Sequence, residues 1–90
     1  MKITLKKVFL KDIQRVAEPH KRDVKAFLEQ LHANPKILET FSHVKKLQSN
    51  KKGDFYRIRF GEYRLGYERK DDEIIIYRIL HRKEIDRYFP

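Results

Sequence analysis

The sequence predicts an α+β fold in the order β-α-α-β-β-β-α, with an N-terminal helical hairpin packed on one face of a small antiparallel sheet. Two observations support this class. Apolar residues recur at helical spacing before residue 35, and they alternate with polar residues after residue 54. The 90 residues, 40% of them hydrophobic, suffice for one modest core, so we expect a single domain over residues 1–90.

The N-terminal part is predicted to form a short strand and two helices. Residues 2–6 alternate polar and apolar side chains, as a strand requires. The first helix has apolar residues at helical spacing: Phe9, Ile13, Val16 and Ala17. The second helix shows the same pattern: Val24, Phe27, Leu28 and Leu31. Pro19 suits the first turn of this second helix, and Asn34-Pro35 ends it.

The C-terminal part is predicted to contain three strands and a short helix or tail. Between the helices and these strands, one helical turn is expected near Leu38, and a polar turn at residues 50–53. The strands cover residues 54–60, 63–69 and 73–80, and the terminal helix or tail covers residues 82–89. Gly61-Glu62 and residues 70–72 supply the turns that connect the strands.

The Gly61-Glu62 turn defines how its two flanking strands pair. A two-residue loop with glycine first is typical of a tight hairpin, and it places Arg59 opposite Arg64. Side chains alternate along a strand, so Arg57 lies on the same face as these two arginines. We expect the helices to cover the opposite, apolar face: Tyr56, Ile58, Phe60, Tyr63, Leu65 and Tyr67.

Three arginines on one sheet face predict an anion site. Like charges directly opposite each other cost a sheet about 0.2–1 kcal/mol per pair, so a purely structural sheet gains nothing from them. Guanidinium groups bind phosphate in a fork geometry. The alternative is that these arginines line a solvated face or pair with Glu62 and Glu68.

The sequence does not define the register of the last strand, because the looser turn at residues 70–72 allows more than one pairing. Its two alternative inward faces are Ile74, Ile76, Arg78 and Leu80, or Ile75, Tyr77 and Ile79. At the end of this strand, His81 and Arg82 are placed so that their side chains can reach over the open face of the sheet.

The charge distribution agrees with an anionic partner. The chain has a formal net charge of +9, and residues 45–70 hold nine basic and three acidic side chains. Such an excess favours nucleic acid, an anionic membrane surface or an acidic protein, and a solubilising surface is the alternative explanation.

Several chemistries are excluded by the composition. The absence of cysteine excludes disulfides, thiolate zinc sites and a cysteine nucleophile. The four histidines and the carboxylates are scattered, so we expect no metal and no cofactor. No apolar run approaches the ~18–20 residues of a membrane span, and the start lacks the apolar segment of a signal peptide. We therefore expect a soluble, cytoplasmic protein.

Three segments carry a family pattern: YRIRFGEYRLGYE at 56–68, IIIYRIL at 74–80 and HRKEIDRYF at 81–89. Together with the Lys-Lys-Leu segment at 45–47, they resemble the RelE/ParE superfamily of toxins from type II toxin–antitoxin pairs, and the resemblance extends over the whole chain. RelE-like members cut mRNA in the ribosomal A site by transfer to the neighbouring 2′-hydroxyl. The resemblance therefore implies a metal-independent endoribonuclease, an mRNA interferase that arrests translation.

The resemblance also implies roles for four arginines. Arg57 and Arg59 match two basic positions of the family's second strand. Arg64 matches the arginine of its Tyr-Arg pair, and Arg82 the arginine at the end of the last strand. We expect these residues to hold the scissile phosphate and to stabilise the charge that develops on it. Arginine stays protonated near neutral pH and is therefore a poor general base.

The position of the family's tyrosine leaves two interpretations open. The tyrosine often follows the His-Arg-x-x-Ile segment directly, where this chain has Asp86, and some members carry it two residues later, which matches Tyr88. Tyr88 is either the catalytic tyrosine or a packing residue. If Asp86 replaces the tyrosine, the activity is attenuated or its proton transfer is rearranged. His81 is another candidate proton carrier, because imidazole titrates near neutral pH.

Partners follow from the same resemblance. We expect mRNA and the ribosome to meet the basic side chains Lys45, Lys46, Lys51, Lys52, Arg57, Arg59 and Arg64. An acidic, amphipathic antitoxin segment would wrap the helices of a monomeric toxin within a toxin–antitoxin hetero-oligomer. Two alternatives remain open: a ParE-like toxin that poisons DNA gyrase, and a catalytically weak module that only binds an antitoxin. The concentrated basic face favours the nuclease.

Overall fold

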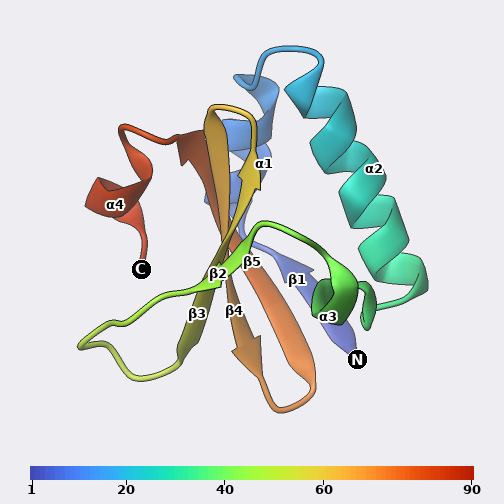
Figure 1. Cartoon of the computed structure of the whole chain (residues 1–90), viewed down its shortest axis with the longest axis vertical. Coiled ribbons are helices and arrows are strands. Elements are labelled where there is room, and N and C mark those ends of the chain that lie inside the picture. Colours follow the sequence, from blue (N-terminus) through green and yellow to red (C-terminus); the bar gives the residue numbers. More distant parts are fainter.

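Five strands form one twisted sheet with helices on both of its sides (Figure 1). The computed structural model describes all residues from 1 to 90. In chain order the elements are β1 (Lys2–Leu5), α1 (Lys7–Gln14), α2 (His20–Ala33), α3 (Ile37–Thr40), β2 (Val44–Lys46), β3 (Asp54–Phe60), β4 (Tyr63–Lys70), β5 (Glu73–His81) and α4 (Ile85–Tyr88). The strand order across the sheet is β1-β5-β4-β3-β2. None of the helices has the length and apolar composition needed to cross a membrane.

The β3–β4 hairpin has the register that its turn predicts. Phe60 pairs with Tyr63 and Arg59 pairs with Arg64. Gly61 has a φ of 58°, a left-handed conformation that glycine adopts without a steric penalty. The prediction that alternating side chains divide into an apolar face and an arginine face is confirmed.

The apolar face of the sheet is buried under α1 and α2. One cluster joins both helices to the sheet: Phe9, Ile13, Val16, Val24, Phe27, Leu31, Leu38, Ile58, Phe60, Leu65, Tyr67, Ile74, Ile76 and Ile79. Helix α1 lies against β5, whereas α2 lies against β3. The periodic apolar residues of both helices therefore point at the face that strand alternation predicts.

The sheet differs from the prediction in direction and in size. Strand β1 runs parallel to β5, so the sheet is mixed and the expectation of a purely antiparallel sheet is wrong. Strand β2 is an additional edge strand that pairs with β3. Its three residues are too few to show an alternating pattern in the sequence. The direction of β1 depends on its pairing with β5, near the other end of the chain, which local alternation does not encode.

A bulge decides the register of β5. Tyr67 pairs with Ile76, whereas the preceding Gly66 pairs with Arg78, so Tyr77 is an extra residue in β5. One extra residue moves all later side chains to the other face. Ile76 therefore faces α1 and α2 before the bulge, and Ile79 faces them after it. Neither predicted alternative is correct over the whole strand.

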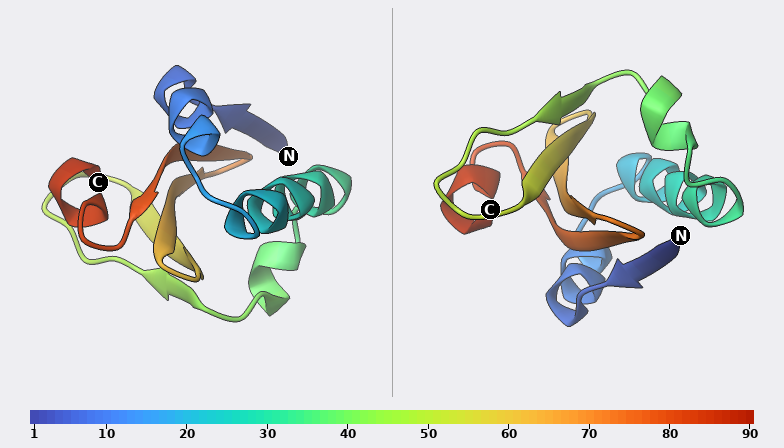
Figure 2. Two further views of the ribbon diagram at one scale, coloured as in Figure 1. Left: turned by 90° about the horizontal axis from the view of Figure 1, so that it is seen from above. Right: turned by 90° about the horizontal axis from the view of Figure 1, so that it is seen from below.

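A smaller cluster lies on the other side of the sheet, under the C-terminal segment. Phe55, Ile85 and Phe89 are buried there. The ring of Phe89 rests on Gly66, where a Cβ atom would collide with it. Viewed from above, α2 and α4 lie on opposite sides of the twisted sheet (Figure 2). Helix α4 thus brings the C-terminus to the arginine-bearing side.

Candidate active site

The hairpin arginines gather beside the edge strand β2. Arg57, Arg59 and Arg64 line an open cavity of about 300 Å³. The remaining lining residues are His43, Val44 and Lys45. We name these six residues the arginine pocket. The prediction that the three arginines share one face is confirmed, and their catalytic role stays a prediction.

Positive charges influence one another within this pocket. Burial lowers the pKa of Arg64, and the charges of Arg57, Arg59 and Arg82 lower it further, while Glu62 acts in the opposite direction. Guanidinium groups this close together repel one another, and an anion bound between them offsets this repulsion. The pocket is therefore suited to a phosphate group.

Neighbouring groups hold two of the arginines in place. Nη1 of Arg64 donates to the carbonyl oxygens of Gly61 at 2.8 Å and Tyr63 at 3.0 Å. Nε of Arg82 lies 2.7 Å from Oε2 of Glu62. The backbone N–H of Arg82 also donates to the carbonyl oxygen of Glu62 at 2.7 Å. Side chains that are already fixed lose less conformational entropy when they bind a ligand.

Arg82 adjoins the arginine pocket through a second cavity of about 390 Å³. His43, Arg59 and Arg64 line both cavities. All four predicted arginines therefore border two neighbouring cavities that share three lining residues.

Helix α4 contributes a carboxylate to the same region. Asp86 forms an ion pair with Nη1 of Arg57. The Asp86 side chain is 79% exposed and that of Arg57 only 21%. Position 86, where the resemblance predicts a tyrosine, therefore does contact the arginine pocket. The carboxylate of Asp86 neutralises part of the positive charge of this pocket.

Only one of the four predicted lysines joins the arginine pocket. Lys45 lies on the pocket side of β2, whereas Lys46 points to the other side, where its Nζ lies 6.0 Å from the centroid of the Tyr56 ring. Lys51 and Lys52 belong to the exposed loop between β2 and β3. Lys52 lines a different cavity. RNA contacts by these three lysines remain predictions.

His81 and Tyr88 lie apart from the arginine pocket. They line a third cavity of about 520 Å³ together with Asp12 and Arg78. The half-exposed Tyr88 ring stacks on the guanidinium of Arg78, with its centroid 5.2 Å from Cζ. Nδ1 of His81 accepts the backbone N–H of Lys83 at 3.1 Å. Catalytic roles for His81 and Tyr88 stay predictions.

His43 is a pocket residue that the sequence did not single out. Its Nδ1 lies 3.5 Å from Nη2 of Arg59, and its φ is 69°. Scattered histidines gave no signal for a site. The only available sign was its position two residues before Lys45, at the start of the basic segment.

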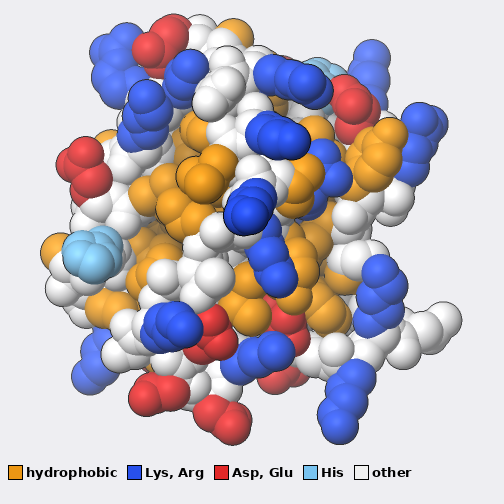
Figure 3. Space-filling view, turned by 180° about the vertical axis from the view of Figure 1, so that it is seen from behind, with side chains coloured by type: hydrophobic (Ala, Val, Ile, Leu, Met, Phe, Trp, Pro, Cys, Tyr) orange, Lys and Arg blue, Asp and Glu red, His pale blue; other side chains and the backbone are white.

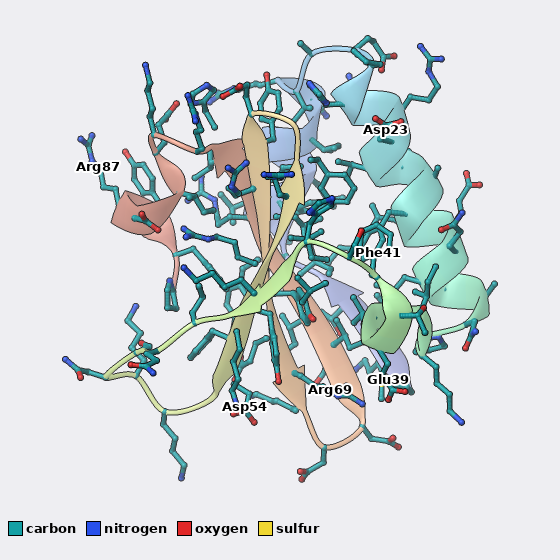
Figure 4. All side chains as sticks on the ribbon, in the orientation of Figure 1. Asp23, Glu39, Phe41, Asp54, Arg69 and Arg87 are labelled. Atoms are coloured by element: carbon teal, nitrogen blue, oxygen red, sulfur yellow. The ribbon has the colours of Figure 1, made fainter.

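Positive charge alone does not define the site. Further Lys and Arg side chains lie among hydrophobic ones on the face that Figure 1 hides (Figure 3). Arg69, on the same strand as Arg64, instead lies 3.9 Å from a carboxylate oxygen of Glu39 in α3 (Figure 4). No group of three or more His, Asp or Glu side chains is arranged to hold a metal ion. A shared face and a shared cavity distinguish the arginine pocket from the rest of the basic surface.

Known proteins match this chain over most of its length. The family model described as the ParE toxin of the type II toxin–antitoxin system parDE matches residues 3–86. Toxin RelE3 of Methanocaldococcus jannaschii is 36% identical over 90 residues, which cover 100% of both chains.

Solved structures agree with this match. The toxin in the crystal structure of the RelB-RelE antitoxin–toxin complex from Methanococcus jannaschii has a TM-score of 0.82 at 33% identity, covering 97% of this chain and 99% of that one. The archaeal RelE-RelB complex from Pyrococcus horikoshii gives a TM-score of 0.69 at 29% identity, covering 93% and 97%. With family model, full-length relative and fold in agreement, the chain belongs to the RelE/ParE superfamily of type II toxin–antitoxin toxins.

Proposed function

We propose that this toxin, a single domain acting in the cytoplasm, is a metal-independent endoribonuclease that cuts mRNA in the ribosomal A site and arrests translation. The arginine pocket, with Arg82 beside it, is the observation that carries the proposal. Attack of a 2′-hydroxyl on phosphorus concentrates negative charge on the phosphate oxygens, and fixed guanidinium groups stabilise that charge. The relatives named RelE support this function over others of the superfamily.

Arg57, Arg59 and Arg64 would bind the non-bridging oxygens of the scissile phosphate, and Arg82 would extend the cradle at the hairpin turn. The reaction forms a bond from the 2′-oxygen to phosphorus and breaks the bond to the 5′-oxygen. The 2′-hydroxyl must lose a proton and the 5′-oxygen must gain one. His81 and Tyr88 remain our candidates for the second transfer, since His81 directly precedes Arg82.

Primer extension on mRNA after induction of the toxin tests this proposal. The wild-type protein should produce cuts that follow the reading frame, and Arg64→Ala and Arg82→Ala should abolish both the cuts and the growth arrest. Arg87→Ala is the matched control, because Arg87 is exposed and projects away from the sheet on α4 (Figure 4). Cutting by Arg64→Ala at the wild-type level would refute the assignment.

The second candidate is a gyrase-poisoning toxin, because the matching family model is described as a ParE toxin. Induction would then trigger a DNA-damage response while mRNA stays intact. The arginine pocket has no evident use in that function, which is why we place the nuclease first.

We also propose a cognate acidic antitoxin, because the two archaeal relatives were solved as complexes with RelB. The toxin would enter the complex as a monomer, with acidic side chains of the antitoxin near the arginine pocket. Co-expression with a small acidic protein encoded beside the toxin should yield a complex whose affinity falls more steeply with rising salt when Arg57 and Arg59 are intact than when both are replaced by Gln.

A further inference from the structure

We propose that His43 is the general base that accepts the proton of the attacking 2′-hydroxyl. The proposal rests on the nuclease function above and adds a residue to its site. His43 is exposed, so RNA can reach its ring, and it lines both cavities that the arginines border. A phosphate bound between Arg59 and Arg64 would therefore lie beside the imidazole.

The other residues of the arginine pocket are unsuited to this step. The guanidinium groups and the ammonium group of Lys45 are protonated near neutral pH, and Val44 is apolar. The carboxylate of Asp86 lines neither of the two cavities and contacts the site only through Arg57. An imidazole exchanges protons near neutral pH and is the commonest general base in enzymes.

Arg59 orients the ring of His43. Nη2 of Arg59 lies 3.5 Å from Nδ1 of His43. A guanidinium group has only donors, so the lone pair of Nδ1 faces it and the neutral ring carries its proton on Nε2. When Arg59 turns to bind the phosphate, it releases the lone pair of Nδ1, which then lies beside that phosphate and can accept a proton. In RNA the 2′-hydroxyl is on the carbon next to the one that bears this phosphate.

The backbone at position 43 favours a functional role for the side chain. His43 has a φ of 69°, in the left-handed region that glycine adopts without penalty and most other residues avoid. Its carbonyl oxygen accepts the N–H of Arg59 at 3.3 Å, so the turn leads directly into the pairing of β2 with β3. Glycine would make the same turn at a lower conformational cost. Strained residues of this kind concentrate at functional sites.

The 2′-oxygen bonds to phosphorus while its proton passes to Nδ1 of His43. The bond from phosphorus to the 5′-oxygen breaks, and that oxygen takes a proton from His81, from Tyr88 or from water. The products are a 2′,3′-cyclic phosphate and a 5′-hydroxyl, and the imidazolium then returns its proton to water. Arg59 and Arg64 stabilise the extra charge on phosphorus throughout.

Two substitutions separate proton transfer from folding. Asparagine and glycine both tolerate the left-handed backbone, so His43→Asn and His43→Gly should fold as well as the wild type. Single-turnover cleavage of a defined mRNA on programmed ribosomes should slow by about 10²–10⁴-fold in both variants, with substrate affinity little changed. His32→Asn, at an exposed position of α2, should keep the wild-type rate.

The pH profile and chemical rescue test the base directly. The wild-type rate should rise with pH from about 5, while the His43→Asn rate should lack this rise; if His81 donates the second proton, both rates should fall at higher pH. The charged groups around His43 are Lys45, Arg57, Arg59, Glu62, Arg64 and Arg82. None of these residue types ordinarily titrates between pH 6 and 8. Added imidazole should restore part of the activity of His43→Gly, which a structural role would not allow.

The outcomes distinguish this inference from the proposed function. Full activity of His43→Asn beside an inactive Arg64→Ala, or His43→Gly that imidazole does not rescue, would overturn the role of His43 alone. Absence of cleavage by the wild-type protein on programmed ribosomes would overturn the nuclease function and the inference with it.

Discussion

On the helix side of the sheet, Asp12 of α1 binds Arg78 of β5, and on the C-terminal side Asp86 of α4 binds Arg57 of β3. The first aspartate is only 5% exposed, whereas the second is 79% exposed. Asp12 accepts hydrogen bonds from Nε of Arg78 at 2.7 Å, from its Nη2 at 3.0 Å and from the N–H of Ile79 at 3.2 Å. The same two residue types thus form two kinds of ion pair. In one the aspartate is buried and fully hydrogen-bonded, and in the other it is exposed at a cavity.

Burial decides what each pair can do. The hydrogen bond to Asp12 raises the pKa of Arg78, with burial acting in the opposite direction, so this guanidinium is committed to its partner. Breaking a buried pair is costly, because the remaining charge has no partner and little water. An exposed pair contributes little to folding, so Arg57 can exchange Asp86 for another anion at small cost. The helix side therefore fixes the fold, and the C-terminal side keeps a replaceable counter-ion.

The largest effect is expected from Asp12→Ala. It leaves the guanidinium of Arg78 and the N–H of Ile79 without their acceptor, so the free energy of unfolding should fall by about 3 kcal/mol. Urea denaturation followed by circular dichroism measures this. Asp23→Ala, at an exposed carboxylate of α2 that points to solvent (Figure 4), should cost less than about 1 kcal/mol. Equal losses in the two variants would contradict the structural role of Asp12.

Gly66→Ala should have the next largest effect, and it acts on the C-terminal side. The added Cβ would collide with the ring of Phe89, so the ring must move away from the sheet. Overpacking of this kind costs about 1–3 kcal/mol, and it should also loosen α4 and with it the contact between Asp86 and Arg57. Urea denaturation of Gly66→Ala, Phe89→Leu and the double variant measures the coupling, and strictly additive losses would show that the ring does not rest on Gly66.

The hairpin and its arginine face could be predicted because their determinants are local. A turn of two residues defines the register of Arg59 with Arg64, and alternation then distributes every side chain of β3 and β4. The helices could be predicted for the same reason, since their apolar spacing is a property of each segment. Strand β2 and the parallel pairing of β1 could not, because they depend on partners distant in the sequence.

The bulge and the pocket histidine were missed for similar reasons. The extra residue Tyr77 in β5 brings Arg78 to Asp12 of α1, a contact between residues 66 positions apart. His43 enters the arginine pocket through a left-handed turn at a histidine, which no residue pattern announces. The predicted arginines were found because they belong to the hairpin, whereas His43 and Asp86 reach them from an edge strand and the last helix.

A smaller effect, dependent on pH, is expected at the second buried carboxylate. The hydroxyl of Tyr77 donates to Oε1 of Glu68 at 2.7 Å, on the C-terminal side. Burial and this carboxylate raise the pKa of Tyr77 to about 12 from the ordinary value of 10.0. A raised pKa means that neutral Tyr77 stabilises the folded state below pH 10, and that this stability is lost as the pH rises from 10 to 12.

The free energy of unfolding should therefore fall more steeply between pH 10 and 12 in the wild type than in Tyr77→Phe. Burial also raises the pKa of Tyr67, so the variant should retain part of the slope. Urea denaturation at several pH values gives both curves. Identical slopes would mean that the hydroxyl of Tyr77 titrates as it does in the unfolded chain.

The smallest effect on stability, and the most informative one for the site, is expected from Asp86→Asn. An exposed ion pair is worth at most about 1 kcal/mol, so folding should hardly change. Removing the carboxylate frees Arg57 for phosphate, and binding of a non-cleavable 2′-O-methyl RNA should tighten by about 3–10-fold at low salt, less at high salt. Fluorescence anisotropy measures this. Glu84→Gln removes the same charge from a neighbouring exposed position. If both variants tighten binding equally, net charge alone is responsible; if only Asp86→Asn does, the toxin carries an internal competitor for its substrate.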